Sequence, residues 1–488
     1  MIAAPVDKFL NLAEVSEMDR TLEPLTLPES HDSRQSVSRG SWLRRFAHEV
    51  RSQYDPLANL HAIISRPPHR EPIIDGARAI AICWVISVHL ILYHIGVFPQ
   101  ETLTLFRMPW LHLAARGDMG VDLFFVISGY LIGSLLLGEF AASGTIHVKR
   151  FYLRRFLRLI PVYTVAMVLA LYFLHGLHAG RIWANLLYVN NFLPIDRQFM
   201  PWCWSLAIEE QFYILLPGLV LLLMRFQRIR WPWMCAFLVL AGATHWTVIY
   251  ANRIVPPFTD MPGMPSYDWR LTIEYQNLYT RCGGLLIGFI GAYAVTFHKS
   301  SVRRIFTRTT AINLIGLCCL IAMLLIGLTS MGLPASSPTA GSSTPAFVLD
   351  AFFNRFAPAL RQLWLAEHRD VFALCTLFLV LAGMFSPSLL GSLIRRVLSS
   401  PIWRPIAQLS YSLYLTHEML LVWIIPRTVR HLGRFLGPYQ LIVFDCVLSL
   451  CAMLVCSAAL FALIEKPSMD MRSLPAIREL TSTGNDRK

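Results

Sequence analysis

The chain has 488 residues, of which 55% are hydrophobic and 15% are charged, and its mean hydropathy is +0.50. Soluble domains carry about 25% charged residues, and apolar runs of membrane-spanning length recur along this chain, so we predict an all-α polytopic membrane protein. The net charge of +13 does not indicate nucleic-acid binding, because the Lys and Arg residues cluster in short loops between apolar runs, where they act as topology signals.

Residues 1–70 are polar, contain Pro and Ser, and have no apolar stretch near the start, so no secretory signal peptide is predicted. We expect a largely disordered cytoplasmic tail. Trp42 and Phe46, together with Arg44 and Arg45, also fit a basic amphipathic helix on an anionic membrane surface. The sequence leaves both interpretations of this stretch open.

The first apolar segment, near 73–97, is long enough to cross a bilayer, yet it carries Asp75, Arg78, His89 and His94. Ionisable residues at membrane depth are costly and indicate a functional site by default. Arg78 and His89 are eleven residues apart. Eleven steps of about 100° return to nearly the same helix face, and place His89 about 16 Å deeper than Arg78. We therefore expect both side chains to face one polar, water-accessible cavity.

Further apolar segments bring the expected number of transmembrane helices to about ten, within a domain over residues 71–468. The expected spans lie near 73–97, 119–138, 159–177, 205–224, 232–251, 275–297, 310–331, 371–389, 404–426 and 439–464. The basic loops between them place both termini in the cytoplasm, with 469–488 as a C-terminal tail. Ten cysteines without a C-x-x-C pair predict neither disulfides nor a zinc site, and we expect no metal.

Two segments do not fit this simple alternation. The stretch 427–438 is basic but falls on the outer side, so either the count is off by one span or its arginines meet an anionic acceptor or lipid. The stretch 181–194 is short and holds three Asn residues, and we expect it to be interfacial or re-entrant.

Several polar residues interrupt the later spans. Asp122, near the outer end of the second span, is suited to orient an imidazole or pair with an arginine, or it is only a charge at a helix N-terminus. Arg155 and Arg158 are neighbours on a helix and suit phosphate binding, although such a pair at a membrane edge is also typical of a topology anchor. Glu209 lies in the following span.

Two further sites lie in later spans. Arg281 stands beside Gly283 and Gly284, and a buried arginine there implies a carboxylate partner or an anionic ligand. His417 and Glu418 interrupt the apolar ninth span. A histidine in such a helix is more often a satisfied core residue than a ligand.

Taken together, seven segments resemble the acyltransferase-3 family, the bacterial integral-membrane acyltransferases that O-acylate polysaccharides and other exported acceptors. In the family's order over residues 72–468 they are DGARAIAICWVISVH, GVDLFFVISGYLI, RRFLRLIPVY, WSLAIEEQFYILLP, TRCGGLLIG, LSYSLYLTH and IEKP. The resemblance implies a ten-helix domain in the bacterial inner membrane, with acyl-CoA, usually acetyl-CoA, as the cytoplasmic donor. The implied acceptor is a hydroxyl of an exported or cell-surface carbohydrate or a related molecule.

The resemblance also implies roles for individual residues. Arg78 and His89 match the family's arginine and histidine pair, and Arg155 and Arg158 match its R-x-x-R motif, which would bind CoA. Four other residues match recurrent polar positions of the family. Asp122 and Glu209 are expected to act in catalysis, and Arg281 and His417 in substrate binding. The long N-terminal tail is outside the usual core. We expect no hydrolase-like domain after the last span, so a second transfer step would need a separate periplasmic or glycan-assembly partner.

Acyl transfer to a hydroxyl needs a base and a stabiliser for the oxyanion. His89 is expected to act as that base or to carry the acyl group itself. Asp122 or Glu209 would hold its tautomer, and Arg78 would bind the donor's phosphates or stabilise charge. Two other functions remain open: a transporter that uses the buried residues as a proton or anion pathway, and a non-catalytic membrane partner in glycan assembly.

Overall fold

The computed structural model describes residues 54–65, 71–105, 108–226, 230–252, 271–328, 358–474 and 477. All regular elements in these ranges are helices, and no strand occurs among them. The long helices are α4 (Pro72–Val97), α7 (Asp118–Ser143), α8 (Val148–Phe173), α10 (Trp204–Arg225), α11 (Arg230–Ala251), α13 (Leu278–Phe297), α15 (Thr309–Leu328), α17 (Pro358–Phe385), α19 (Trp403–Leu432) and α20 (Pro438–Leu460). Nine helical segments in the described part are long and apolar enough to span a membrane, which confirms the predicted all-α polytopic membrane protein.

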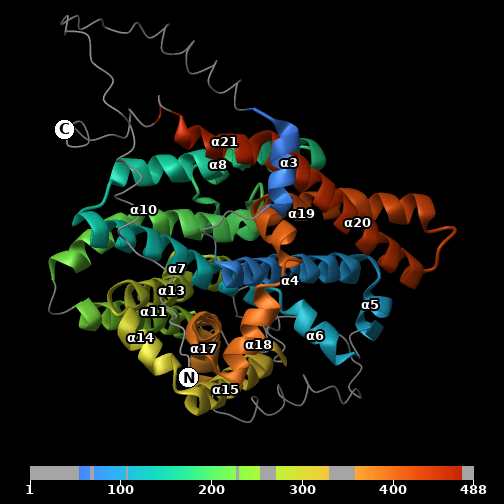
Figure 1. Ribbon diagram of the computed structural model, residues 1–488. Coiled ribbons are helices and arrows are strands. Elements are labelled where there is room, and N and C mark those ends of the chain that lie inside the picture. Colours follow the sequence, from blue (N-terminus) through green and yellow to red (C-terminus); the bar gives the residue numbers. More distant parts are fainter. Residues whose placement is uncertain are drawn as a thin grey trace, which may run out of the picture. The chain divides into compact units, whose positions relative to one another are not determined.

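Helix α19 is the tenth long helix and contains the expected span 404–426, although it is not among the nine apolar ones. Its length of 30 residues is sufficient, but polar residues such as Ser412, Thr416 and His417 make it less apolar than a lipid-facing helix. All three are fully buried. Helix α19 packs against α4 on one side and α20 on the other (Figure 1). Its polar face is therefore covered by neighbouring helices.

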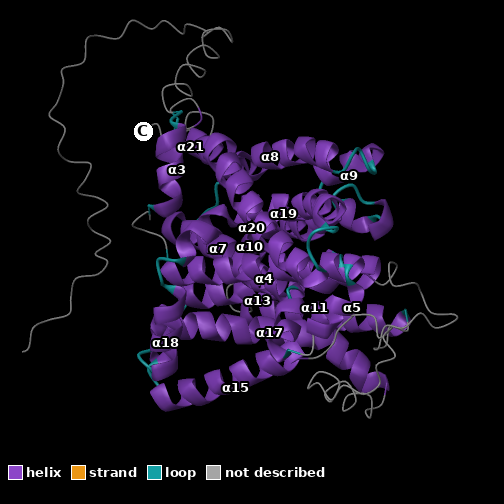
Figure 2. Cartoon of the chain, turned by 90° about the vertical axis from the view of Figure 1, so that its right-hand side faces the viewer, coloured by secondary structure: helices purple, strands orange, loops and turns teal. Residues whose placement is uncertain are grey.

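The long helices alternate in direction along the chain, so the bundle has two ends, which we call the Pro72 end and the Val97 end after the two ends of α4. At the Pro72 end, α18 (Leu389–Leu398) crosses the ends of its neighbours, whereas α5 (Pro99–Leu105) lies at the Val97 end (Figure 2). The basic stretch 427–438 lies where α19 ends and α20 begins. Both flanking helices are present, and the stretch lies at the Val97 end.

Helices α7 and α13 form a close contact through small residues. A Cβ atom on Gly129 would collide with the backbone of Leu285, and one on Gly288 with the backbone of Val126. Only glycine permits this approach, as expected for helix pairs in membranes. The contact fixes the start of α7, with its acidic residues, beside the start of α13.

Residues 181–194 do not span the membrane. They form the short helix α9 (Ile182–Leu186) and a 3₁₀ turn, Asn190–Phe192, that is folded into the bundle. Gln211 of α10 donates hydrogen bonds to the Asn191 Oδ1 atom at 2.9 Å and the Tyr188 carbonyl at 2.8 Å. The three asparagines of this stretch are fully buried, which supports the re-entrant interpretation.

Part of the expected tail is ordered. Helix α3 (Pro56–Ile64) begins after Asp55, whose carboxylate accepts hydrogen bonds from the first free backbone N–H groups of the helix. The Asn59 amide donates to the Ala462 carbonyl at 2.9 Å, within the π-helical turn Phe461–Glu465 of the last span. The sequence carries a good N-cap here, and the helix, PLANLHAII, is apolar, but its nine residues are too few to be read as a membrane span. The expected amphipathic helix around Trp42 lies outside the described residues.

Candidate active site

His89 projects from α4 toward α19. Its Nδ1 atom lies 2.8 Å from the Val85 carbonyl, and because a carbonyl only accepts, Nδ1 carries the ring proton. The Nε2 atom therefore has the free lone pair, and it lies 3.6 Å from the Glu418 carboxylate on α19. The His89 side chain retains 24% of its accessible surface. His89 therefore has an unprotonated ring nitrogen on a partly exposed side chain.

His417 completes a cluster with His89 and Glu418. Its Nδ1 atom donates to the Tyr414 carbonyl at 2.7 Å, so its Nε2 atom is also a lone-pair acceptor, buried without a partner among the described residues. The two imidazole rings meet edge to face with centroids 4.7 Å apart. The Tyr93 hydroxyl donates to the second oxygen of Glu418 at 3.3 Å.

This cluster is rich in acceptors and poor in donors. One ring nitrogen of each histidine and a carboxylate oxygen of Glu418 lie within 4.8 Å of one another. The Nε2 atoms of both rings carry no proton. The arrangement can take a proton from a bound hydroxyl. Among the described residues, this is also the group whose donor set, two histidines and one carboxylate, suits a metal ion. The absence of a metal remains a prediction.

Arg78 also meets α19. Its Nη2 atom donates to the Ser410 hydroxyl at 2.8 Å, toward the Pro72 end of the seam where His89 meets His417. Two residues on, Ser412 donates to the Glu465 carboxylate at 2.6 Å. Arg78 and His89 both contact α19, as expected for residues on one helix face, and the water-accessible cavity expected between them stays a prediction.

Of the two roles expected for Asp122, orienting an imidazole or pairing with an arginine, the structure shows the second. One of its carboxylate oxygens accepts from Arg281 at 2.8 Å and the other from Arg369 at 2.7 Å. Both oxygens are thus occupied by guanidinium groups, and the carboxylate beside His89 is Glu418. The expectation that Arg281 has a carboxylate partner is confirmed.

The arginine pair of Asp122 belongs to a buried network near the Val97 end. Arg369 also bonds Asp118 at 3.0 Å, and Arg116 pairs with Asp118 at 2.9 Å. The guanidinium of Arg281 lies 4.6 Å from the centroid of the Tyr275 ring and 5.2 Å from that of Trp204. Opposite charges and aromatic faces thus compensate the buried arginines. These residues form a buried ion-pair network that links α7, α13 and α17.

Glu209 likewise contacts other groups than His89. It accepts hydrogen bonds from Ser128 of α7 and Tyr213 of α10, each at 3.0 Å. The guanidinium of Arg155 lies 4.9 Å above the ring of Tyr213, the same tyrosine that donates to Glu209. Glu209 therefore belongs with the R-x-x-R arginine, because its helix face turns toward α7 and α8. The predicted role of Glu209 in holding the imidazole is wrong for this arrangement.

Glu418 and Arg369 are two of the residues of the site to which the sequence assigned no role. Glu418 follows His417 directly, and a second ionisable residue in one apolar helix was the available signal. Arg369 was placed outside its span, which was expected to begin at 371. Helix α17 begins at Pro358 instead. The charged residues in its first half lower the local hydropathy, so the predicted span began too late, but they do not interrupt the helix.

Comparison with known proteins agrees with this picture. The acyltransferase domain family matches residues 71–461. Peptidoglycan O-acetyltransferase OatA of Listeria monocytogenes is 32% identical over 249 residues, which cover 47% of this chain and 35% of that protein. Nose resistant to fluoxetine protein 6 of Caenorhabditis elegans is 24% identical over 394 residues, 71% of this chain and 44% of that protein.

The matched part thus spans well under two thirds of these relatives' own length. No solved structure matches the chain. The family match covers most of the chain, including α4, the R-x-x-R helix and α19. The chain therefore belongs to the acyltransferase-3 family.

Proposed function

We propose that this protein is an O-acetyltransferase of the bacterial inner membrane. It moves an acetyl group from cytoplasmic acetyl-CoA to a hydroxyl of an exported or cell-surface carbohydrate, with both termini in the cytoplasm. The observation that carries the proposal is the His89 Nε2 atom, which has a free lone pair and faces Glu418 in a seam between two membrane helices. The family match and the printed name of the Listeria relative support acetyl transfer to a carbohydrate.

The proposed reaction is a single displacement at the thioester carbonyl. His89 Nε2 removes the proton of the acceptor hydroxyl as its oxygen bonds to the carbonyl carbon, and the resulting imidazolium is stabilised by Glu418. The tetrahedral intermediate then collapses with cleavage of the carbon–sulfur bond. The departing thiolate takes the proton from His89, so an ester and free CoA leave and the imidazole is regenerated.

Arg78 is too far from His89 to contact the carbonyl group that reacts there. Eleven helical residues separate it from His89, about 16 Å along α4. The pantetheine arm of CoA likewise separates its thioester from its phosphates. We therefore assign Arg78, with Arg155 and Arg158, to the donor's anionic part on the Pro72 side. Arg281 is assigned to the buried network and His417 to the acceptor pocket.

Removing one guanidinium of the R-x-x-R pair is expected to weaken donor binding. We expect Arg155→Ala or Arg158→Ala to raise KM for acetyl-CoA about 10- to 100-fold with a smaller change in kcat, since a charge-assisted hydrogen bond contributes about 1.5–3 kcal/mol. Initial-rate kinetics of the purified protein measure this. Arg154→Ala, at the exposed neighbouring position, is the matched control. Unchanged KM values would show that the pair is only a topology anchor.

Chelation separates the two interpretations of the His89, His417 and Glu418 cluster. We expect activity to survive EDTA or 1,10-phenanthroline and subsequent gel filtration, because a proton, not a metal ion, satisfies the acceptors in the proposed reaction. Elemental analysis of the purified protein accompanies the assay. Loss of activity that zinc restores would assign the cluster to a metal centre instead.

The proposed function is tested with the purified full-length protein in detergent and radiolabelled acetyl-CoA. Release of free CoA that depends on a carbohydrate acceptor and on His89 supports the enzyme. Proteoliposomes that show CoA-independent solute flux would favour the transporter, and neither signal would leave the non-catalytic partner. Glycan analysis of cells with and without the protein identifies the acceptor by the ester that disappears.

A further inference from the structure

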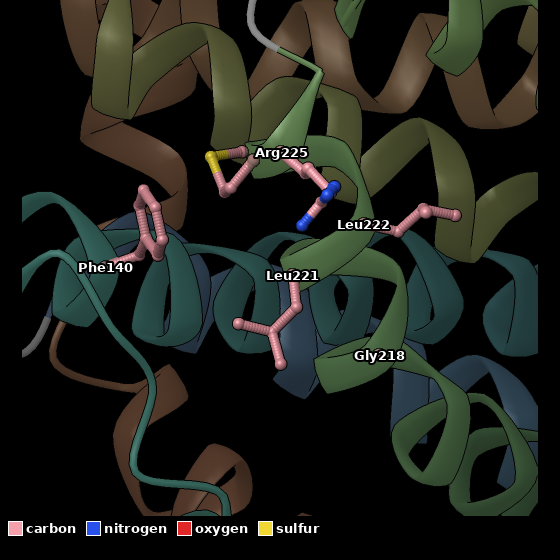
Figure 3. A pocket seen from close by; sticks show the side chains of 6 residues that line it. Phe140, Gly218, Leu221, Leu222 and Arg225 are labelled. Atoms are coloured by element: carbon pink, nitrogen blue, oxygen red, sulfur yellow. The ribbon is translucent and has the colours of Figure 1, made fainter.

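A cavity of about 580 Å³ lies between α7 and the last turns of α10, remote from the α4–α19 seam. Phe140 of α7 forms one side, and α10 forms the other with Leu221, Leu222 and Arg225 (Figure 3). Gly218 and Met224 complete the lining. The cavity is wide open, and its walls are apolar except for one guanidinium.

The backbone of Gly218 borders open space in this groove. A Cβ atom added there would have no heavy atom within 4 Å. Leu221 and Leu222 are 43% and 49% exposed, so the cavity is a groove open on the bundle surface. An apolar groove on the surface of a membrane helix matches the hydrocarbon chain of a lipid.

The charge at the groove's end selects the headgroup. Arg225 is the last residue of α10, at the Pro72 end, and its exposed side chain has no ion-pair partner among the described residues. The nearby Arg230 guanidinium instead donates hydrogen bonds to the backbone carbonyls of Leu223 and Met224, at 3.3 and 3.1 Å. Among the residues that the structure describes around the groove, Arg225 is thus a cation without an ion-pair partner, and none of the lining residues is a carboxylate.

We propose that this groove binds one anionic phospholipid, with an acyl chain along Gly218 and the phosphate at Arg225. An amphipathic arginine at the end of a spanning helix reaches the headgroup layer, where basic side chains attract anionic lipids. The site is independent of the proposed acetyl transfer.

Native mass spectrometry of the delipidated full-length protein tests the proposal. We expect one phosphatidylglycerol to bind about tenfold more tightly than phosphatidylcholine of the same chains. Gly218→Leu should remove this binding by filling the groove, and Arg225→Gln should abolish the preference for phosphatidylglycerol. Gly96→Leu, another position where an added Cβ meets nothing, is the control and should bind as the wild type does.

Other outcomes would overturn the proposal. Equal affinity for both lipids in the wild type would indicate ordinary lipid contact without headgroup recognition. Wild-type binding by Gly218→Leu, with an unchanged gel-filtration profile, would place the lipid elsewhere. Competition by glycerol 3-phosphate alone would assign the site to free phosphates, and competition by acetyl-CoA would assign the groove to the acyl donor.

Discussion

Replacing His89 by alanine is expected to lower acetyl transfer by about 10²- to 10⁴-fold, the usual contribution of a positioned general base. The Val85 carbonyl fixes the ring tautomer, so His89 Nε2 is the basic atom that points out of α4. Alanine leaves no acceptor at that point. The radiolabel assay with acetyl-CoA and a carbohydrate acceptor measures the loss.

Two variants control for indirect effects. His61→Ala removes an exposed histidine of α3 and should leave the rate unchanged. Glu418→Gln should produce a smaller loss than His89→Ala, because Glu418 acts only by stabilising the His89 imidazolium. Normal transfer by His89→Ala would refute the assignment. An equally large loss in His61→Ala would show that the assay reports folding.

Local helix geometry explains what the sequence could predict. Apolar length located the spans, and the eleven-residue spacing correctly placed Arg78 and His89 on one face, because both properties depend on a single helix. The identity of the packed neighbours depends on contacts between distant segments. For this reason the sequence could not indicate that Glu418, rather than Asp122 or Glu209, is the carboxylate beside His89.

The roles of the two aspartate-bound arginines show the same limit. Arg281 was expected to need a carboxylate partner or an anionic ligand, since an isolated buried charge is costly, and this requirement needs no knowledge of the fold. Its partner could not be chosen from sequence, because several carboxylates occur at similar depth. Arg369 was missed because hydropathy places the start of a span at its first apolar turn, whereas α17 continues through its charged residues.

Replacing Asp122 by asparagine is expected to destabilise the protein by about 3–5 kcal/mol, the usual result of breaking a buried ion pair. In the wild type, one carboxylate oxygen of Asp122 accepts a hydrogen bond from Arg281 and the other accepts one from Arg369. An amide keeps only one acceptor and turns an N–H group toward the second arginine. Both arginines also lose the charge that compensates their burial. Thermal unfolding in detergent should show a lower Tm.

An exposed pair provides the matched control. Asp196 is 57% exposed and lies 3.9 Å from Arg197, so Asp196→Asn should change stability by less than about 1 kcal/mol. A catalytic role for Asp122, as first expected from the sequence, gives a different pattern. Asp122→Asn would then unfold at the wild-type temperature but lose acetyl transfer. Lower stability, with activity retained in the fraction that remains folded, assigns Asp122 to the ion network that holds α7, α13 and α17 together.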